Sequence, residues 1–93
     1  MPYDLRYHPK VKADLKRISA DARRRIRSAI ESRLTTEPER FGVPLQGALR
    51  PYWKLRVGDY RILFWVAGET VAILAILHRK DAYEQAERRI GRG

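Results

Sequence analysis

The chain has 93 residues, of which 44% are hydrophobic and 33% are charged, and its formal net charge is +9. This balance predicts one folded globular domain over residues 1–93 and excludes a disordered chain. The absence of cysteine excludes disulfides and cysteine metal sites, and the two histidines are too few for a usual metal centre. We therefore expect no metal and no other cofactor.

The positive charge points to an anionic partner. Fifteen of the twenty basic residues are arginine, whose planar, always-charged guanidinium matches phosphate oxygens. Small basic domains most often bind nucleic acid, an anionic membrane or an acidic protein, and the alternative is a protein from an arginine-rich proteome. The longest apolar run, residues 71–77, is too short to span a bilayer. The chain opens without a secretory signal, so we expect a cytoplasmic protein with no membrane partner.

The first half of the chain predicts a strand and two helices. Tyrosine and leucine alternate with polar residues over 3–7, as in a short strand with one buried face. Apolar spacing predicts a helix from about Pro9 to Ile18 and a second helix that Ser19 caps and Pro38 ends. Since almost nothing joins them, the two helices form an antiparallel hairpin. The second helix buries Ala22, Ile26, Ile30 and Leu34.

The second half predicts three consecutive strands and a last helix. A loop rich in glycine and proline over 41–51 precedes strands at about 52–57 and 60–66. The next strand, 70–77, is continuously apolar, as expected when both faces are covered. A helix over 82–90 ends the pattern. The order predicts an α+β fold in which a curved, mostly antiparallel sheet carries the helical hairpin on one face.

The hairpin between the first two of these strands concentrates positive charge. Val57-Gly58-Asp59-Tyr60 places glycine at the first central position of a two-residue turn. Counting outward puts Arg56 opposite Arg61, with Lys54 on the same face. Like charges directly opposite are destabilising, so a carboxylate (Asp59 or Asp81) or an external phosphate must relieve them.

Aromatic residues lie beside this charge. Trp65 has the same strand parity as Arg61 and suits a cation–aromatic contact with it. The combination of arginine and aromatic rings also suits RNA recognition, in which bases stack on rings or guanidinium planes. Four further arginines lie on the second helix, where we expect a solvated face: Arg23, Arg24, Arg25 and Arg27.

The segment HRKDAY follows the most buried predicted strand, with Asp81 as the expected helix cap. His78, Arg79 and Tyr83 offer a general acid or base, a phosphate clamp and a phenol. RNA cleavage needs groups that deprotonate the 2′-hydroxyl, stabilise the phosphorane and protonate the 5′-oxygen. Fixed arginines and lysines can supply the charge without a metal. The structural alternatives are a capping role for His78 and simple packing for Tyr83.

The stretch LQGALRPYWKLRVGDYRILFWVAGETVAILAILHRKDAY resembles the core of RelE/ParE-superfamily toxins of bacterial type II toxin–antitoxin systems. The resemblance covers essentially the whole chain and implies the same fold. RelE-type members are ribosome-dependent endoribonucleases that cleave mRNA in the ribosomal A site by metal-independent 2′-hydroxyl attack. ParE-type members share the fold but inhibit DNA gyrase. The implied partners are the ribosome and mRNA, an acidic antitoxin encoded alongside and, alternatively, DNA gyrase.

The resemblance also implies site residues, position by position. The family's basic residues before the hairpin turn match Lys54 and Arg56, and its arginine after the turn matches Arg61. Its arginine near the end of the last strand matches Arg79, the following tyrosine matches Tyr83, and some members place a histidine nearby. The implied catalytic residues are Lys54, Arg56, Arg61, His78, Arg79 and Tyr83. The implied RNA-binding residues are Lys54, Arg56, Arg61, Arg79 and Lys80.

Overall fold

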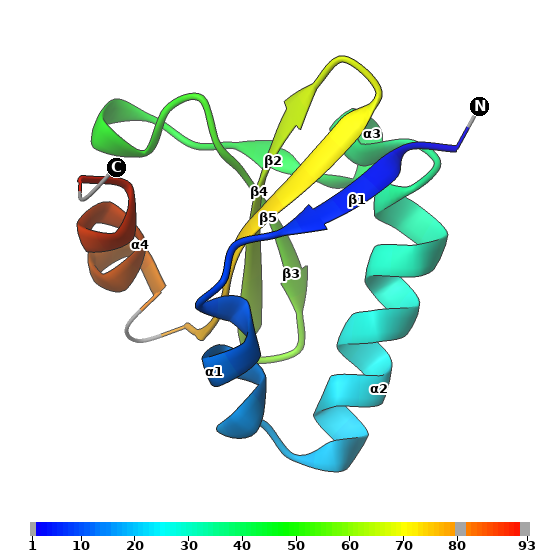
Figure 1. Cartoon of the computed structure of the whole chain (residues 1–93), viewed down its shortest axis with the longest axis vertical. Helices are drawn as coiled ribbons and strands as arrows, with labels where there is room; N and C mark the ends of the chain where they lie inside the picture. Colours follow the sequence, from blue (N-terminus) through cyan, green and yellow to red (C-terminus); the bar gives the residue numbers. More distant parts are fainter. Residues whose placement is uncertain (1, 80–81, 92–93) are drawn as a thin grey trace.

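The computed structural model describes residues 2–79 and 82–91. Its elements follow the expected order, with one extra strand and three short helical segments (Figure 1). They are β1 (Asp4–Tyr7), α1 (Val11–Lys16), α2 (Ala20–Ala29), the π-helical η1 (Ile30–Leu34), α3 (Pro38–Phe41), β2 (Val43–Pro44), the 3-10 helix η2 (Gly47–Leu49), β3 (Trp53–Val57), β4 (Tyr60–Ala67), β5 (Thr70–His78) and α4 (Ala82–Gly91).

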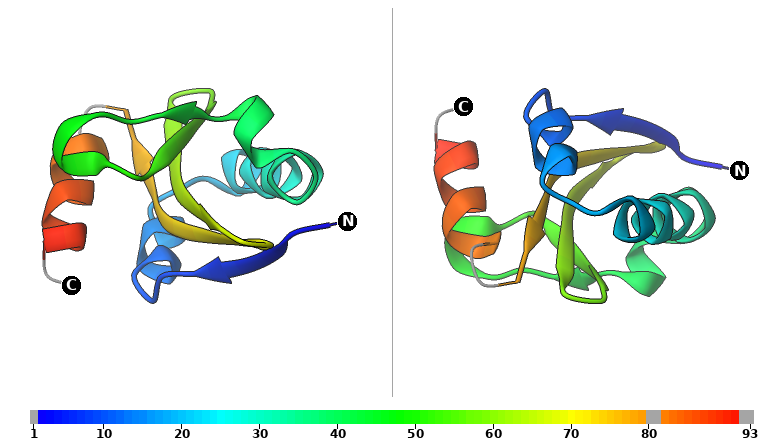
Figure 2. Two further views of the ribbon diagram at one scale, coloured as in Figure 1. Left: turned by 90° about the horizontal axis from the view of Figure 1, so that it is seen from above. Right: turned by 90° about the horizontal axis from the view of Figure 1, so that it is seen from below.

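One five-stranded sheet organises the molecule, in the order β1-β5-β4-β3-β2. β1 runs parallel to β5, and every other neighbouring pair is antiparallel. The helices α1 and α2 pack against one face, and α4 packs against the other (Figure 2). This arrangement confirms the predicted α+β class with a mostly antiparallel sheet. No helix in the described parts of the chain is long and apolar enough to cross a membrane.

The helical hairpin forms as expected but with different ends. The Ser19 hydroxyl accepts a hydrogen bond from the Ala22 backbone N–H at 3.2 Å, which confirms the predicted cap. The first helix is shorter than expected, because Pro9 and Lys10 form a turn in which His8 Nδ1 accepts the Lys10 N–H at 3.1 Å. Pro38 begins α3, at a position where its missing N–H breaks no helical bond.

The predicted loop before the hairpin contains a strand that the sequence did not reveal. β2 has two residues and pairs Val43 with Lys54 and Pro44 with Trp53. It forms the sheet edge, where proline is tolerated because no further strand needs its N–H. A two-residue strand carries no period that sequence inspection can detect.

The hairpin register is as predicted. Arg56 lies opposite Arg61, Val57 opposite Tyr60, and the pairing continues to the end of β3. Gly58 adopts a φ of 59°, which glycine reaches without strain. The pairing of β4 with β5 is irregular at one point. Leu63 lies opposite Ala75, but Phe64 lies opposite Ile73, so β5 has one extra residue between these two pairs.

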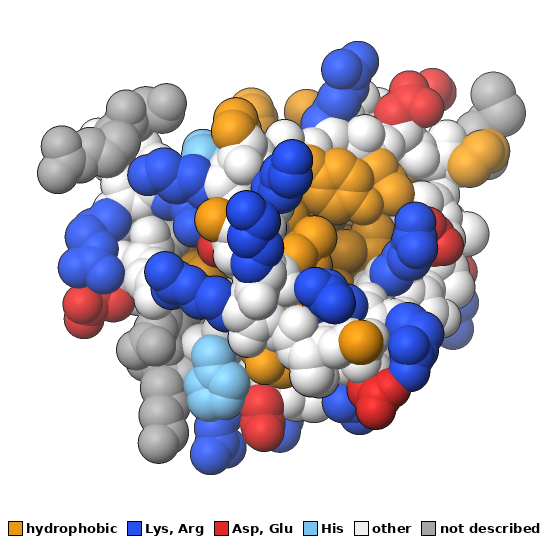
Figure 3. All heavy atoms as spheres, turned by 60° about the horizontal axis from the view of Figure 1, so that its bottom comes forward, with side chains coloured by type: hydrophobic (Ala, Val, Ile, Leu, Met, Phe, Trp, Pro, Cys, Tyr) orange, Lys and Arg blue, Asp and Glu red, His pale blue; other side chains and the backbone are white. Residues whose placement is uncertain are grey.

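Two apolar cores form, one on each face of the sheet. On the α2 side the predicted stripe is buried, with Ile26, Ile30 and Leu34 at most 2% exposed. The expectation for the first strand was partly wrong, because Tyr7 is 50% exposed. Tyr7 lines an open groove of about 550 Å³ between α1 and α2, where half of its surface stays exposed. Figure 3 shows apolar side chains in a hollow on this side of the molecule, among Lys and Arg.

Candidate functional site

Four basic residues gather on the sheet face that carries α4: Lys54, Arg56, Arg61 and Arg79, which we call the basic cluster. Side chains two residues apart on a strand share a face, and the apolar residues sharing this face, including Leu63 and Leu77, belong to the core beneath α4. The Arg79 backbone N–H donates to the Asp59 carbonyl at 2.8 Å, which extends the β4–β5 pairing to the hairpin turn. Three strands therefore bring the cluster together.

Backbone carbonyls of the turn offset only part of the repulsion between Arg56 and Arg61. Arg56 Nε and Arg61 Nη1 both turn towards the Gly58 carbonyl oxygen, at 3.3 Å and 3.5 Å. Arg61 Nη1 also donates to the Tyr60 carbonyl at 3.3 Å. Neither guanidinium forms an ion pair with a carboxylate of the described residues. Carbonyl dipoles therefore solvate the two positive charges, and no carboxylate of residues 2–79 or 82–91 neutralises them.

Asp59 lies near Arg79, whereas we expected it to lie near Arg56 and Arg61. Its carboxylate lies 3.9 Å from Arg79 Nη1, at the outer limit of an ion pair, and both side chains are more than half exposed. Such a pair contributes little to stability. Asp81, the other expected partner, lies outside the described residues. The predicted internal relief of Arg56 and Arg61 by Asp59 is therefore wrong.

The expected contact between Arg61 and Trp65 does not form. Within residues 2–79 and 82–91, the cation–aromatic contacts of the cluster involve Lys54 alone. Arg61 folds back onto the turn carbonyls, and Leu63 separates it from Trp65 along the strand. Trp65 instead meets Tyr52, with ring centroids 6.3 Å apart.

Lys54 and Tyr83 form the most specific contact of the site. Lys54 Nζ donates to the Tyr83 hydroxyl at 3.1 Å and lies 5.6 Å from the centre of its ring. The two residues are 29 positions apart in sequence, and both are half-buried. Tyr83 reaches this place because α4 packs its ring against the second apolar core. Tyr83 therefore combines the packing role with a polar contact to the basic cluster.

His78 is not brought to the basic cluster. It pairs with Tyr60 across the sheet, and the two rings meet edge to face at 5.6 Å and 88°. Tyr60 packs against the α2-side core, on the opposite face from Lys54. The extra residue in β5 causes this placement. If the pairing continued from the turn between β4 and β5 without that residue, residue 78 would lie opposite Asp59, on the sheet face that carries the arginines. Lys80, the remaining expected RNA-binding residue, lies outside the described residues.

Sequence inspection missed a buried ion pair that fastens α4. Arg89 Nη1 and Nη2 donate to Asp14 Oδ2 and Oδ1 at 2.9 Å and 3.0 Å, and Arg89 also donates to the Leu74 carbonyl at 2.9 Å. The side chains of Arg89 and Asp14 are 9% and 7% exposed. A signal was present: Asp14 follows Val11 by three and precedes Ile18 by four, which places a carboxylate within the apolar stripe.

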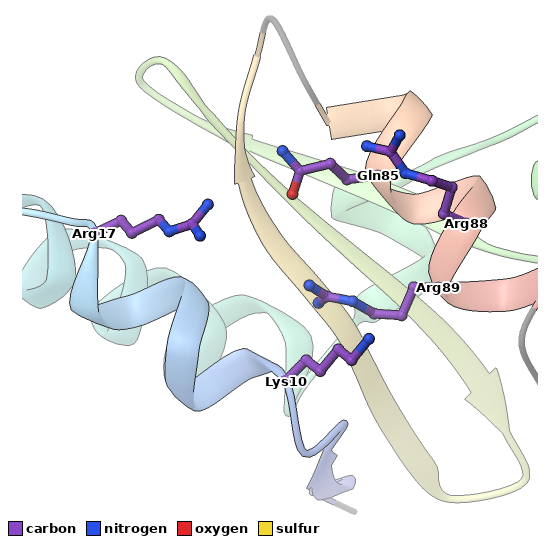
Figure 4. Close-up of a pocket in the computed structure, with 5 residues that line it drawn as sticks. All are labelled: Lys10, Arg17, Gln85, Arg88 and Arg89. Carbon is purple, nitrogen blue, oxygen red and sulfur yellow. The ribbon is translucent and has the colours of Figure 1, made fainter.

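A basic groove of about 630 Å³ lies beside this ion pair, between α1 and α4 (Figure 4). Lys10 and Arg17 face it from the two ends of α1, and Arg88 and Arg89 face it from α4. His8 lies two residues before Lys10 in the chain. Partial burial and the nearby charges of Arg89 and Lys10 lower the pKa of His8. Among the described residues, no group of three or more histidines and carboxylates is placed to hold a metal.

Partial burial also affects Tyr7, at the end of β1. Burial is the main reason that the pKa of Tyr7 is raised, and the Glu31 carboxylate raises it further. The nearby Arg27 guanidinium acts in the opposite direction. Tyr7 lines the groove between α1 and α2 and also a smaller hollow at the end of β1.

Comparisons with known proteins agree with this fold. The model of the family described as ParE toxin of the type II toxin–antitoxin system, parDE, matches residues 5–83. The chain is 32% identical to toxin RelG of Mycobacterium tuberculosis over 87 residues, which cover 91% of this chain and 100% of that protein. The toxin–antitoxin complex RelBE2 of the same organism contains a chain with 31% identity and a TM-score of 0.79, with 87% of this chain and 95% of that chain covered.

A third similar protein comes from an archaeon. A chain of the RelB–RelE antitoxin–toxin complex from Methanococcus jannaschii has 27% identity and a TM-score of 0.66, covering 86% of this chain and 96% of that chain. Fold and matches together define a small α+β toxin of a type II toxin–antitoxin system. The chain belongs to the ParE toxin family, within the RelE/ParE superfamily. This confirms the resemblance drawn from LRVGDYRILF and HRKDAY.

Proposed function

We propose that this toxin is a ribosome-dependent endoribonuclease that cleaves mRNA and thereby inhibits translation. The observation that carries the proposal is the contact between Lys54 and Tyr83 at 3.1 Å, on the same face as Arg56 and Arg61, whose guanidinium groups form no ion pair within the described part of the chain. Proton-transfer groups and anion-binding groups thus share one sheet face. Cleavage of an RNA phosphodiester needs both kinds of group.

The basic cluster would act on the scissile phosphate. Guanidinium groups bind two phosphate oxygens at once, and fixed positive charges stabilise the phosphorane as it forms. The guanidinium of Arg61 is positioned by its carbonyl acceptor, and the backbone of Arg79 is joined to the turn, which places this residue beside the hairpin. We assign phosphate binding and transition-state stabilisation to Arg61 and Arg79, with Arg56 contributing to backbone binding.

Lys54 and Tyr83 would handle the protons. A phenol hydroxyl both donates and accepts hydrogen bonds, and Tyr83 already accepts one from Lys54. One of the two would help remove the proton of the 2′-hydroxyl, whose oxygen attacks the phosphorus, and a proton would return to the leaving 5′-oxygen. The products are a 2′,3′-cyclic phosphate and a 5′-hydroxyl. We no longer assign proton transfer to His78, since it faces Tyr60 on the opposite side of the sheet.

An acidic antitoxin is the partner that this surface suits. The similar chains of RelBE2 and of the Methanococcus RelB–RelE complex were solved with their antitoxins. A net charge of +9 favours an acidic partner. We propose that the antitoxin covers the basic cluster or displaces α4. Displacing α4 would remove Tyr83 from Lys54 and thereby dismantle the site.

Inhibition of DNA gyrase is the second candidate, because the matching family model is described as a ParE toxin. One experiment separates the two functions. Purified protein is added to a translating bacterial extract, and mRNA ends are mapped by primer extension. The same preparation is tested for inhibition of gyrase supercoiling. New ends within translated codons, with supercoiling unaffected, support the nuclease. Intact mRNA with blocked supercoiling would replace it with the gyrase inhibitor.

A further inference from the structure

An aromatic pair extends the basic cluster along the same face of the sheet. Trp65 on β4 and Tyr52, just before β3, have ring centroids 6.3 Å apart and planes tilted by 56°. Trp65 is 43% exposed, which is unusual for so large an apolar side chain at the centre of a sheet. The cleavage chemistry proposed above uses neither ring.

A small residue leaves space beside Trp65. Ala72 on β5 pairs with Trp65 on one side and with Arg6 on β1 on the other. Because Ala72 ends at its methyl group, the two long side chains flank a depression. A hollow of about 230 Å³ lies nearby, and the residues that line it include Arg6, Tyr7, His8, Tyr52, Ala72 and Leu74. Trp65 does not line this hollow itself but adjoins it through Tyr52, whose ring centroid lies 6.3 Å from that of Trp65. The surroundings of the hollow therefore offer an aromatic wall, an apolar floor and one positive charge.

This hollow continues the basic cluster and is not an isolated patch. Trp65 follows Leu63 by two residues on β4, and Leu63 lies opposite Lys54. Since a strand rises about 3.3 Å per residue, the row of Trp65 lies roughly 7 Å from the row of Lys54 and roughly 13 Å from that of Arg61. An extended nucleic-acid strand whose phosphate contacts the cluster can thus place a neighbouring base here.

We propose that Trp65, supported by Tyr52 and Arg6, is a nucleobase-stacking subsite for single-stranded RNA bound to the basic cluster. The proposal rests on the proposed nuclease function and adds the place where a base beside the scissile phosphate is held. Every base presents a π-face, so stacking on Trp65 provides affinity with little sequence preference. Arg6 supplies a cation for a phosphate or for the edge of the stacked base.

Tryptophan fluorescence tests stacking directly, because the chain contains two tryptophans on opposite faces. Trp53→Phe leaves Trp65 as the only reporter, and Trp65→Phe leaves Trp53, which packs against Phe64 at 6.5 Å in the other core. Each purified variant is titrated at low salt with a short single-stranded oligoribonucleotide. We expect quenching of Trp65 and little change in Trp53. No quenching of Trp65, or equal quenching of both, would overturn the proposal.

Affinity provides a second readout with a matched control. Trp65→Ala should weaken oligoribonucleotide binding by about 5-fold to 150-fold, the effect of losing one base–aromatic stack. Phe41→Ala is the control, since Phe41 is 40% exposed and lies beside Arg33 and Arg40 but on α3; it should bind as the wild type does. Equal affinities of Trp65→Ala and wild type would refute the subsite. The subsite would also be refuted if polyglutamate, an acidic polymer without bases, bound at Trp65 and RNA did not.

The readouts separate this proposal from the nuclease assignment. Quenching at Trp65 in a protein that leaves mRNA intact in a translating extract would keep the RNA subsite and reject the nuclease. Cleavage of mRNA without quenching, and at an unchanged rate in Trp65→Ala, would keep the nuclease and reject the subsite.

Discussion

Arg89 and Arg61 lie in one small domain but in opposite surroundings. Arg89 is buried, and both oxygens of the Asp14 carboxylate accept hydrogen bonds from it. Arg61 is half-buried at the hairpin and meets only backbone carbonyls, with no ion pair to a carboxylate of the described residues. A guanidinium that leaves water must be neutralised, whereas one at the surface keeps its charge for a partner. Arg89 therefore stabilises the fold, whereas Arg61 is available to bind a partner.

The ion pair of Asp14 and Arg89 also forms hydrogen bonds with backbone groups at an open edge of the sheet. β1 pairs with β5 only as far as Ile73, so among the described strands none neighbours this edge of β5 beyond that point. The Ile76 N–H donates to Asp14 Oδ2 at 3.0 Å, and the Leu74 carbonyl accepts from Arg89. Unpaired buried backbone groups are costly. Asp14 and Arg89 therefore replace the missing strand while they fasten α4 to α1 and β5.

The largest expected effect comes from removing one partner of the buried ion pair between Asp14 and Arg89. Asp14→Ala leaves the Arg89 guanidinium buried without a counter-charge, and it also frees the Ile76 N–H. We expect the free energy of unfolding to fall by about 3–5 kcal/mol, as measured by urea denaturation. Arg61→Ala removes an arginine that has no carboxylate partner among the described residues and also removes the repulsion with Arg56, so it should not lower the free energy of unfolding and should change it by at most about 1 kcal/mol.

A double variant checks that the loss comes from an unpaired charge. Asp14→Leu combined with Arg89→Met replaces the pair with apolar side chains of similar size, and such replacements are often neutral or stabilising. The double variant should recover part of the stability lost in Asp14→Ala, because no charge is left unpaired, but the Ile76 N–H and the Leu74 carbonyl still lose their partners. If it is as unstable as the single variant, the stabilisation comes from the backbone contacts to Leu74 and Ile76, not from charge pairing.

On the functional side, Tyr83→Phe should abolish most activity without unfolding the protein. Phenylalanine keeps the ring in the second apolar core but removes the hydroxyl that contacts Lys54. We expect the rate of mRNA cleavage in a translating extract to fall by about 10²–10⁴-fold, the usual contribution of a proton-transfer group. A Tyr83→Phe protein with an unchanged cleavage rate would remove Tyr83 from the proposed chemistry.

A smaller effect should separate Arg56 from ordinary surface arginines. Arg56→Ala removes the like charge opposite Arg61, so the free energy of unfolding should rise by about 0.2–1 kcal/mol at low salt. Salt screens this repulsion, and the gain should shrink as the ionic strength rises. Arg25→Ala, on the exposed face of α2, is the matched loss of one charge and should show no such gain. A net destabilisation in Arg56→Ala would mean that its bond to Gly58 matters more.

The smallest effect is a pH dependence from His8. Burial and the charges of Arg89 and Lys10 lower the pKa of His8 below its usual 6.5, so the folded state binds its proton less readily than the unfolded state. The contribution of His8 to stability is therefore present above pH 6.5 and declines as the pH falls through the lowered folded pKa. With its modest burial, the change should stay below about 0.5 kcal/mol. An NMR titration that places His8 above 6.5 would contradict this sign.

Local patterns predicted most of the fold and part of the site. The apolar spacing of α2, the Ser19 cap and the Gly58 turn each depend on neighbouring residues, so the helical hairpin and the register of β3 with β4 could be read from the sequence. The turn also placed Arg56 against Arg61. Family resemblance named Lys54 and Tyr83 among the site residues, but their contact was not predicted, since the two residues belong to distant segments.

Features that depend on tertiary structure escaped prediction. One extra residue in β5 shifted His78 from the arginine side of the sheet to the side of Tyr60, and no sequence signal marked that irregularity. The partner of Asp14 is 75 positions away, so its place in an apolar stripe indicated a buried carboxylate but not which cation would neutralise it. β2 is too short to have a detectable pattern.

Arg61 has no counter-charge among the described residues, and we propose that it acts on RNA. The most direct test is primer extension of mRNA from a translating extract after addition of Arg61→Ala, beside wild type and Arg25→Ala. We predict new ends within translated codons for wild type and Arg25→Ala, and a reduction of about 10²–10³-fold for a folded Arg61→Ala protein. Cleavage by Arg61→Ala at the wild-type rate would contradict the claim.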